Sequence, residues 1–217
     1  MNTLIVKRLN ADVTEAQEVV SLLDASSVAY ESIAEVNWAK DFPYAPNVHF
    51  RIAYTDSSLL LHYRVAEDTV RAVTSEDNGR VWEDSCVEFF SAPVGDTGYY
   101  NMEFNCIGSA LVRYGKDRHE RKSAPQDILH QIKRWSSLGS VPFQEKTSQG
   151  SWEVALIIPF SAFFLHEIRP YSGLRMRANF YKCGDLTAKP HFLSWNKIAV
   201  DKPDFHRPEF FGELIFD

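Results

Sequence analysis

The sequence predicts an all-β fold, an antiparallel β-sandwich with a short N-terminal helix. Short segments that alternate apolar and polar residues recur along the chain, and turn-forming residues separate them. No Gly/Ser-rich or Pro-rich linker and no internal repeat divides the 217 residues. We therefore expect one sandwich domain over residues 1–217, with residues 1–46 packed on it as an N-terminal extension.

The composition argues against several classes of protein. A net charge of −6 leaves no basic excess to neutralise phosphates, so a nucleic-acid partner is not expected. No segment approaches the roughly 18 apolar residues of a membrane span. The three cysteines contain no C-x-x-C spacing, which argues against a disulfide framework or a structural zinc site. The apolar run after Met1 is too short for a signal peptide, which favours the cytoplasm unless a leader was removed before this numbering.

The first third of the chain is expected to form a helix and then a hairpin. A capping-box pattern at residues 14–17 precedes an apolar stripe, so we expect a helix that starts there and ends near Ser26. Trp38, Phe42 and Tyr44 follow in a proline-broken segment and are expected to plug one end of a core. Period-two alternation over residues 48–54 and 59–65 then predicts a hairpin.

The middle of the chain predicts a meander of three strands, over residues 86–90, 99–106 and 110–114. The charge run at residues 116–123 favours a solvated loop over a binding role. Apolar spacing over residues 125–135 predicts a short helix that includes Trp135.

The last third predicts four more strands. Residues 152–158 are apolar at both parities, which indicates a central buried strand with Trp152 in the core. Residues 159–164 look like a single helical turn at the end of a sheet. Further strands are expected over residues 174–183, 192–198 and 209–216.

Three of the expected strands carry an unusual set of polar side chains on one face. In each strand, apolar residues alternate with amides, carboxylates or guanidinium groups. The polar positions are Glu88, then Tyr99, Asn101, Glu103 and Asn105, then Arg175, Arg177, Asn179 and Tyr181, and Arg71 is a further candidate for this face. Such groups form directional hydrogen bonds of the kind that sugar hydroxyls require. The alternative is a solvated face with ion pairs such as Glu103 with Arg177.

Two tryptophans favour the binding interpretation of this face. Trp82 precedes the first of these strands, and Trp195 follows the third, both among polar neighbours. Indoles at the rim of a polar face suit the apolar C–H faces of a pyranose ring, whose edge carries hydroxyls. We therefore expect a sugar to lie between Trp82 and Trp195.

The chain resembles the family 9 carbohydrate-binding modules, which are known chiefly as appendages of bacterial xylanases. The resemblance covers roughly Val48 to the C-terminus. It lies in the hairpin of residues 48–65, Val81–Phe90, Tyr99–Asn105, Ile158–Ser161, Arg177–Tyr181, Ser194-Trp195 and Phe205–Leu214. The order and spacing of these segments together carry the likeness.

The resemblance implies an immunoglobulin-like or jelly-roll sandwich that binds sugar ends, with polysaccharides such as xylan or cellulose as the implied ligands. By position, Trp82 and Trp195 would form the clamp and Glu88 the main hydroxyl partner, with Asn179 a further candidate. It also implies structural calcium, although no D-x-D-x-D run supplies a cage. Asp68, Asp77 or Glu83 could contribute, and no organic cofactor is expected.

Two alternative functions stay open beside non-catalytic binding of a mono-, oligo- or polysaccharide. Glu88 and Glu103 on one face could serve as the acid and base of a glycoside hydrolase. A haem- or other ligand-sensing sandwich could use His49, His62 or the cysteines. The sequence contains no G-x-S-x-G elbow, P-loop or H-E-x-x-H motif that would indicate another enzyme class.

Overall fold

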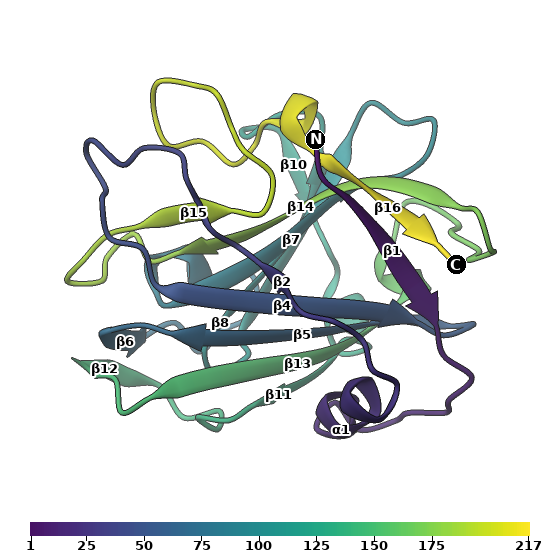
Figure 1. Ribbon diagram of the computed structural model, residues 1–217, viewed down its shortest axis with the longest axis horizontal. Coiled ribbons are helices and arrows are strands. Elements are labelled where there is room, and N and C mark those ends of the chain that lie inside the picture. Colours follow the sequence, from purple (N-terminus) through teal and green to yellow (C-terminus); the bar gives the residue numbers. More distant parts are fainter.

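In a computed structural model that describes residues 1–217, most strands join in one continuous 14-stranded sheet that curls into two facing leaves (Figure 1). The first leaf runs in the order β10 (Arg121–Ser123), β9 (Ala110–Gly115), β8 (Tyr99–Asn105), β7 (Cys86–Ala92), β14 (Arg175–Cys183) and β16 (Gly212–Phe216). The second leaf runs β4 (Asn47–Tyr54), β5 (Ser58–Ala66), β13 (Ser151–Pro159) and β11 (Lys133–Ser136). The predicted β-sandwich is therefore confirmed.

Strand β1 (Thr3–Arg8) joins the two leaves at one edge. Its residues 3–6 pair with β16, and its residues 7 and 8 pair with β4. Both pairings are parallel, whereas every other strand pair is antiparallel, so the sandwich is not purely antiparallel as expected. In Figure 1 the purple β1 lies beside the yellow β16, which brings the two ends of the chain onto one side of the molecule.

The remaining elements are short. Strands β2 (Glu31–Ser32), β3 (Glu35–Val36) and β15 (Phe192–Ser194) extend the main sheet, while β6 (Thr69–Ala72) and β12 (Phe143–Thr147) form a separate pair. The helices are α1 (Glu18–Ala25), α2 (Gln126–Leu129) and the 3₁₀ turns η1 (Val81–Glu83), η2 (Phe160–Ala162) and η3 (Pro208–Phe210). No helix has the length and apolar character that a membrane crossing requires.

The main hydrophobic core fills the space between the two leaves. Alternate residues of the hairpin β4–β5 face alternate residues of β7, β8 and β14, as the period-two pattern predicts. Phe180 of β14 stacks on Phe50 of β4 and on Phe89 of β7, with ring centroids 3.8 Å and 5.1 Å away. Trp152 of β13 is buried in this core, as expected.

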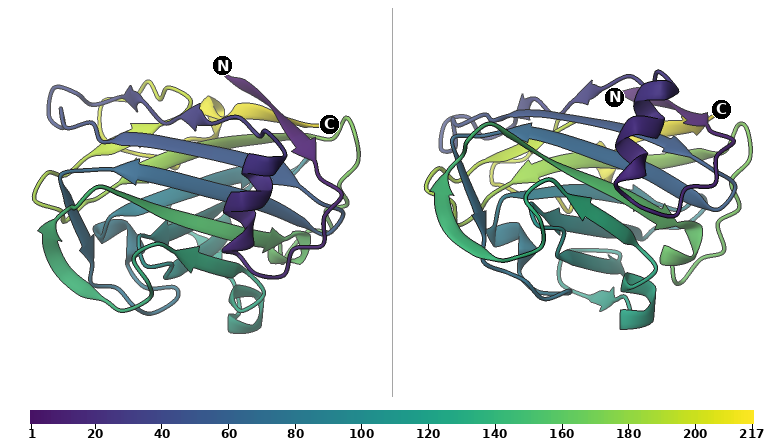
Figure 2. Two further views of the ribbon diagram at one scale, coloured as in Figure 1. Left: turned by 60° about the horizontal axis from the view of Figure 1, so that its bottom comes forward. Right: turned by 90° about the horizontal axis from the view of Figure 1, so that it is seen from below.

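Two smaller apolar clusters cover the outer faces of the sandwich. Helix α1 lies across the second leaf (Figure 2) and packs Val19 and Leu23 against Leu60 and Ile157. The outer face of the first leaf is partly covered by irregular segments from both ends of the chain. These segments contribute Trp38, Ile198, Phe205 and Phe211, which pack with Phe90 and Tyr181. Of the three aromatic residues expected to plug a core, Trp38 is buried in this outer cluster and Phe42 packs against it, whereas the Tyr44 ring contacts His191.

Two helix boundaries differ from the expected ones. Helix α1 starts at Glu18 instead of Thr14, because residues 15–17 form a turn and no side chain caps the helix. Helix α2 ends at Leu129, and Trp135 lies in strand β11, where it pairs with Ala155 of β13. Pairing with β13 overrides the local apolar spacing on which the longer helix was predicted.

Candidate functional site

The strand register places the predicted polar residues on the outer face of the first leaf. Glu88 of β7 lies directly opposite Glu103 of β8 on one side and Tyr181 of β14 on the other. Asn101 stands two residues before Glu103 and therefore shares its face. This face of the first leaf is the one that the sequence pattern predicted.

A pocket of about 370 Å³ opens over this face, between the strands and the segments that cover them. Its residues come from five parts of the chain that are distant in sequence. They include the polar and thiol side chains Glu88, Asn101, Glu103 and Cys183, the aromatic side chains Trp82, Phe192 and Phe205, and the charged or titratable side chains Arg80, Arg113, Arg118, His119, Arg121, Asp185, Asp204 and His206. The pocket therefore combines aromatic surface with many hydrogen-bonding groups, which suits a polar ligand.

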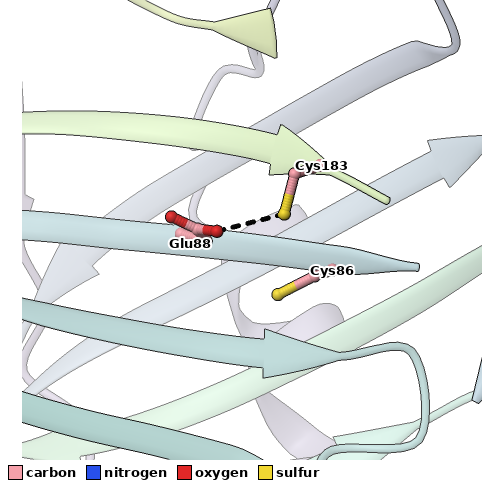
Figure 3. A group of neighbouring side chains, drawn as sticks. All are labelled: Cys86, Glu88 and Cys183. Carbon is pink, nitrogen blue, oxygen red and sulfur yellow. Dashed lines mark hydrogen bonds between the residues drawn. The ribbon is translucent and has the colours of Figure 1, made fainter. Parts of the chain in front are cut away.

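Glu88 and Glu103 form a buried carboxyl pair in this pocket, at 2% and 4% exposure. Glu103 Oε1 accepts a hydrogen bond from Asn101 Nδ2 at 2.8 Å, and Glu88 Oε1 accepts one from the Cys183 thiol at 3.1 Å (Figure 3). The second oxygen of each carboxyl group has no protein partner. Two buried acceptors are thus left for a ligand to satisfy.

Burial dominates the ionisation of both carboxyl groups. It raises the pKa of Glu88 well above its usual range, and the neighbouring charge of Glu103 raises it further. Burial also raises the pKa of Glu103 to about 7, against the opposing hydrogen bond from Asn101 and the charge of Arg113. Burial and the charge of Glu103 thus both favour the protonated form of Glu88, in which a carboxyl group can donate as well as accept hydrogen bonds.

Arginines line the pocket beside these acids. Arg121 donates from Nε to Asn101 Oδ1 at 2.8 Å, and its guanidinium group lies 4.2 Å from the centre of the Tyr99 ring. Arg113 Nε is buried and has no hydrogen-bond partner. Arg118 and Arg121 belong to the charge run at residues 116–123. Residues 116–120 are exposed, as expected of a solvated loop, whereas residues 121–123 form strand β10 and Arg121 is half-buried. Arg121 pairs with Gly115 across the β9–β10 hairpin, and this hairpin folds the run back toward the pocket.

Trp82 lies at the edge of the pocket, as predicted. It is half-buried in the turn η1, directly before β7. The guanidinium group of Arg80 lies 5.8 Å from the centre of its ring. The indole therefore provides a partly exposed apolar surface beside the carboxyl pair.

Trp195 does not lie at the pocket, and the predicted clamp of two tryptophans is not formed. Trp195 is 3% exposed and packs edge-to-face in the main core, with centroids 6.0 Å from Phe50 and 5.7 Å from Phe180. The register explains its orientation. Ser194 pairs with Tyr181, which faces outward, so the next residue points inward with Phe180.

Three further candidates lie outside the pocket. Asn179 is buried, and its side chain bonds the backbone N–H and C=O groups of Asn196, which makes it a structural residue. Arg177 is exposed and donates to the carbonyl of Pro208, so it forms no ion pair with Glu103. Arg71 lies on the separate strand β6 and pairs with Asp84 at 3.3 Å. The strand pattern could not show that the segment of residues 196–208 occupies Asn179 and Arg177, or that Arg71 lies in the separate β6–β12 pair.

The acids suggested for calcium do not form a cage in this structure. Asp68 pairs with Lys189, Asp77 pairs with Arg134 through two hydrogen bonds, and Glu83 pairs with Arg80. Each carboxylate is thus held by a cationic side chain in a different place. The one group of three or more metal-ligating side chains brings together Cys86, Glu88 and Cys183 (Figure 3).

The histidines suggested for haem lie far in the fold from these cysteines. His49 and His62 belong to β4 and β5 of the second leaf, whereas Cys86 and Cys183 belong to β7 and β14 of the first. His62 Nδ1 accepts a hydrogen bond from Arg51 Nε at 3.1 Å, and burial lowers its pKa. His62 is therefore a satisfied buried residue of the second leaf.

Comparison with known proteins relates this chain to carbohydrate-binding proteins. The sequence model of carbohydrate-binding family 9 matches residues 17–216, so the likeness begins well before Val48. The chain is similar to a crystal structure of a candidate carbohydrate-binding protein from Bacteroides uniformis, with 50% identity, 99% of each chain covered and a TM-score of 0.95. Comparison with curated proteins finds no match.

Two solved structures from Caldicellulosiruptor kristjanssonii, both of a family 9 carbohydrate-binding module, share the fold. The complex with glucose has 12% identity and a TM-score of 0.62, over 100% of this chain and 96% of that one. The complex with cellotriose has 14% identity and a TM-score of 0.60, over 99% of this chain and 93% of that one.

Proposed function

This chain belongs to carbohydrate-binding family 9, and we propose that it binds a saccharide, without catalysis, in the pocket over Glu88 and Glu103. The observation that carries this proposal is the pair of buried carboxyl groups, each with an unpartnered oxygen, beside a partly exposed indole. The glucose and cellotriose complexes of the fold relatives agree with a saccharide ligand. Family membership supports the non-catalytic part.

The pocket residues would contact different parts of the sugar according to their chemistry. Trp82 offers an apolar plane on which the C–H face of a sugar ring can stack. Glu88, Glu103 and Asn101 offer donors and acceptors in fixed positions, as vicinal hydroxyls require. Since the backbone of β7 and β8 holds these groups, they are positioned before the ligand arrives.

A second aromatic wall would come from Phe192 in place of Trp195. Phe192 is half-buried and lines the same pocket as Trp82. Phe205 also lines the pocket, but its ring stacks on Tyr181 at 4.2 Å and is mostly covered. We therefore propose that a sugar ring lies between Trp82 and Phe192.

Isothermal titration calorimetry with glucose, xylose, cellotriose and xylotriose tests this proposal. We expect Trp82→Ala to weaken binding about five- to thirtyfold, because the lost stacking is worth about 1–2 kcal/mol. Glu103→Gln should also weaken binding, because it replaces the unpartnered acceptor Oε2 with an amide group that only donates. Trp135→Ala is the matched control, since Trp135 is also half-buried but lies on β11 of the second leaf.

If Trp82→Ala and Glu103→Gln bind the sugars with the same affinity as the wild type, the binding site lies elsewhere. Equal weakening in Trp135→Ala would show a general effect on the fold. If none of these sugars or a broader glycan array gives binding to the wild-type chain, the saccharide proposal fails.

The same carboxyl pair allows a test of the glycoside hydrolase alternative. Glu88 and Glu103 lie directly opposite each other on neighbouring strands, a placement too close for an inverting pair, so a retaining mechanism is the one to test. We expect no turnover of aryl glycosides by the wild-type chain. Turnover that Glu88→Gln abolishes would establish catalysis instead.

A further inference from the structure

Three potential metal ligands converge beneath the pocket, and their convergence follows from the strand register. Cys86 of β7 lies directly opposite Cys183 of β14, and Glu88 stands two residues further along β7 on the same face. The two sulfur atoms and a Glu88 oxygen all lie within 4.8 Å of one another. Figure 3 shows the three side chains near one another, with the Cys183 sulfur directed toward Glu88.

The group is buried and chemically incomplete. Cys86, Glu88 and Cys183 are almost fully inaccessible, and Glu88 forms no salt bridge anywhere in the chain. The Cys183 thiol donates to Glu88 Oε1 at 3.1 Å, while Glu88 Oε2 has no hydrogen-bond partner. An unpartnered carboxyl oxygen at 2% exposure is costly unless something else binds it.

We propose that Cys86, Cys183 and Glu88 bind a single zinc-class divalent metal ion. Two thiolates and one carboxylate are a donor set that Zn²⁺ accepts, and they leave one of its four positions open. Ligand atoms around tetrahedral zinc stand about 3.6–3.8 Å apart, given bond lengths of about 2.3 Å to sulfur and 2.1 Å to oxygen. The present separations, from 3.1 Å up to no more than 4.8 Å, bracket that value, so small side-chain rotations suffice.

Binding of a metal ion here would change both the protonation and the charge of the group. The two thiols and any carboxyl proton are released to solvent when the ion binds. The resulting three negative ligands exceed the 2+ charge by one, and the arginines that line the pocket partly offset this excess. The metal ion would replace the hydrogen bond between the Cys183 thiol and Glu88 Oε1.

The pocket provides a route to the site. Glu88 and Cys183 line the pocket and Cys86 does not, so an ion would reach the group from the pocket side. A water molecule can fill the open fourth position in the absence of sugar. The metal site therefore does not depend on the proposed saccharide function, although the two share Glu88.

Cobalt titration of the reduced, metal-free full chain tests this proposal. Co²⁺ bound by thiolates gives a charge-transfer band in the near ultraviolet and tetrahedral bands in the visible, and Zn²⁺ should displace them at one equivalent. We expect Cys86→Ala and Cys183→Ala to abolish the charge-transfer band. Glu88→Gln should weaken Co²⁺ binding at least tenfold. Cys106→Ala is the matched control, because Cys106 is also buried but bonds the Arg71 carbonyl outside this group.

A variant-free measurement covers the case in which these substitutions unfold the chain. Under partial denaturation, Zn²⁺ should slow maleimide labelling of Cys86 and Cys183 more than that of Cys106, as read by peptide mass spectrometry. The proposal is wrong if wild-type chain shows no thiolate–cobalt band, if the band survives loss of both cysteines, or if Zn²⁺ protects all three thiols equally. Sugar binding without a cobalt band refutes the metal site alone, and a cobalt band without sugar binding refutes the saccharide proposal alone.

Discussion

Replacing Trp195 distinguishes a core residue from a sugar-binding one. Its indole is 3% exposed, contacts the Phe50 and Phe180 rings edge-to-face, and donates from Nε1 to Glu31 at 3.2 Å. Truncation of a buried tryptophan to alanine costs about 3–5 kcal/mol of unfolding free energy. In a chain of this size, each kcal/mol lowers Tm by about 2–4 °C, so Trp195→Ala should lower Tm by roughly 6–20 °C.

Calorimetry or circular dichroism measures this Tm, with Trp82→Ala as the comparison. Trp82 is half-buried at the pocket edge, so its loss should lower stability by only about 1–2 kcal/mol. Trp195→Phe keeps an aromatic ring in the core and should preserve most of the stability. Sugar affinity, measured well below each Tm, should change in Trp82→Ala and stay unchanged in Trp195→Phe.

The opposite pattern would refute this reasoning. If Trp195→Ala keeps the wild-type Tm but loses sugar binding, the indole must be accessible to ligand. A sugar held between Trp82 and Trp195 would then describe the bound protein better than a Trp195 ring buried in the core.

Three further substitutions test other parts of the structure. Burial, and then the Lys182 charge, lowers the pKa of His191 to about 2, so the folded chain stays unprotonated there while the unfolded chain takes up a proton below about pH 6.5. The unfolding free energy should therefore fall by up to about 1.4 kcal/mol per pH unit between pH 6 and 4. In His191→Gln, urea unfolding should show a shallower dependence of this free energy on pH. An equal dependence in both proteins would contradict the argument. Glu67→Gln should lower the unfolding free energy by about 3–5 kcal/mol, because it leaves the buried Lys182 without its carboxylate partner at 2.9 Å. A decrease below about 1 kcal/mol in urea unfolding would contradict burial of the pair. Gly212→Ala should lower the unfolding free energy by about 1–3 kcal/mol in the same assay. The added Cβ would lie 2.5 Å from the Trp195 ring and 2.7 Å from the Asn2 carbonyl oxygen. If the variant is as stable as the wild type, the ring can move away.

The sequence predicted the strands and their faces well because alternation is a local property. Val87 and Phe89 face the core and Glu88 faces outward, whatever strands lie beside them. The hairpin β4–β5 was predicted for the same reason. Strand β1 was missed, because its partners are β16 at the far end of the chain and β4 beyond helix α1.

The site was predicted only in part because its composition depends on tertiary register. Trp195 and Ser194 are adjacent in sequence but face opposite sides of the sheet, and only the pairing with Tyr181 decides which one points outward. The role of Arg121 depends on how the β9–β10 hairpin folds back over Asn101. The absence of a C-x-x-C motif hid the approach of Cys86 and Cys183, because antiparallel pairing joins two positions far apart in sequence.

Strand β1 exchanges partners part-way along its length, from β16 at residues 3–6 to β4 at residues 7 and 8. Separation of the leaves at this edge therefore breaks backbone hydrogen bonds in one short strand. The amides of this strand should exchange with deuterium when either leaf opens, and so report on the less stable of the two. A tag attached at Met1 or Asp217 would emerge beside the edge where β1 joins the two leaves. Its effect on stability is therefore best checked before any binding measurement.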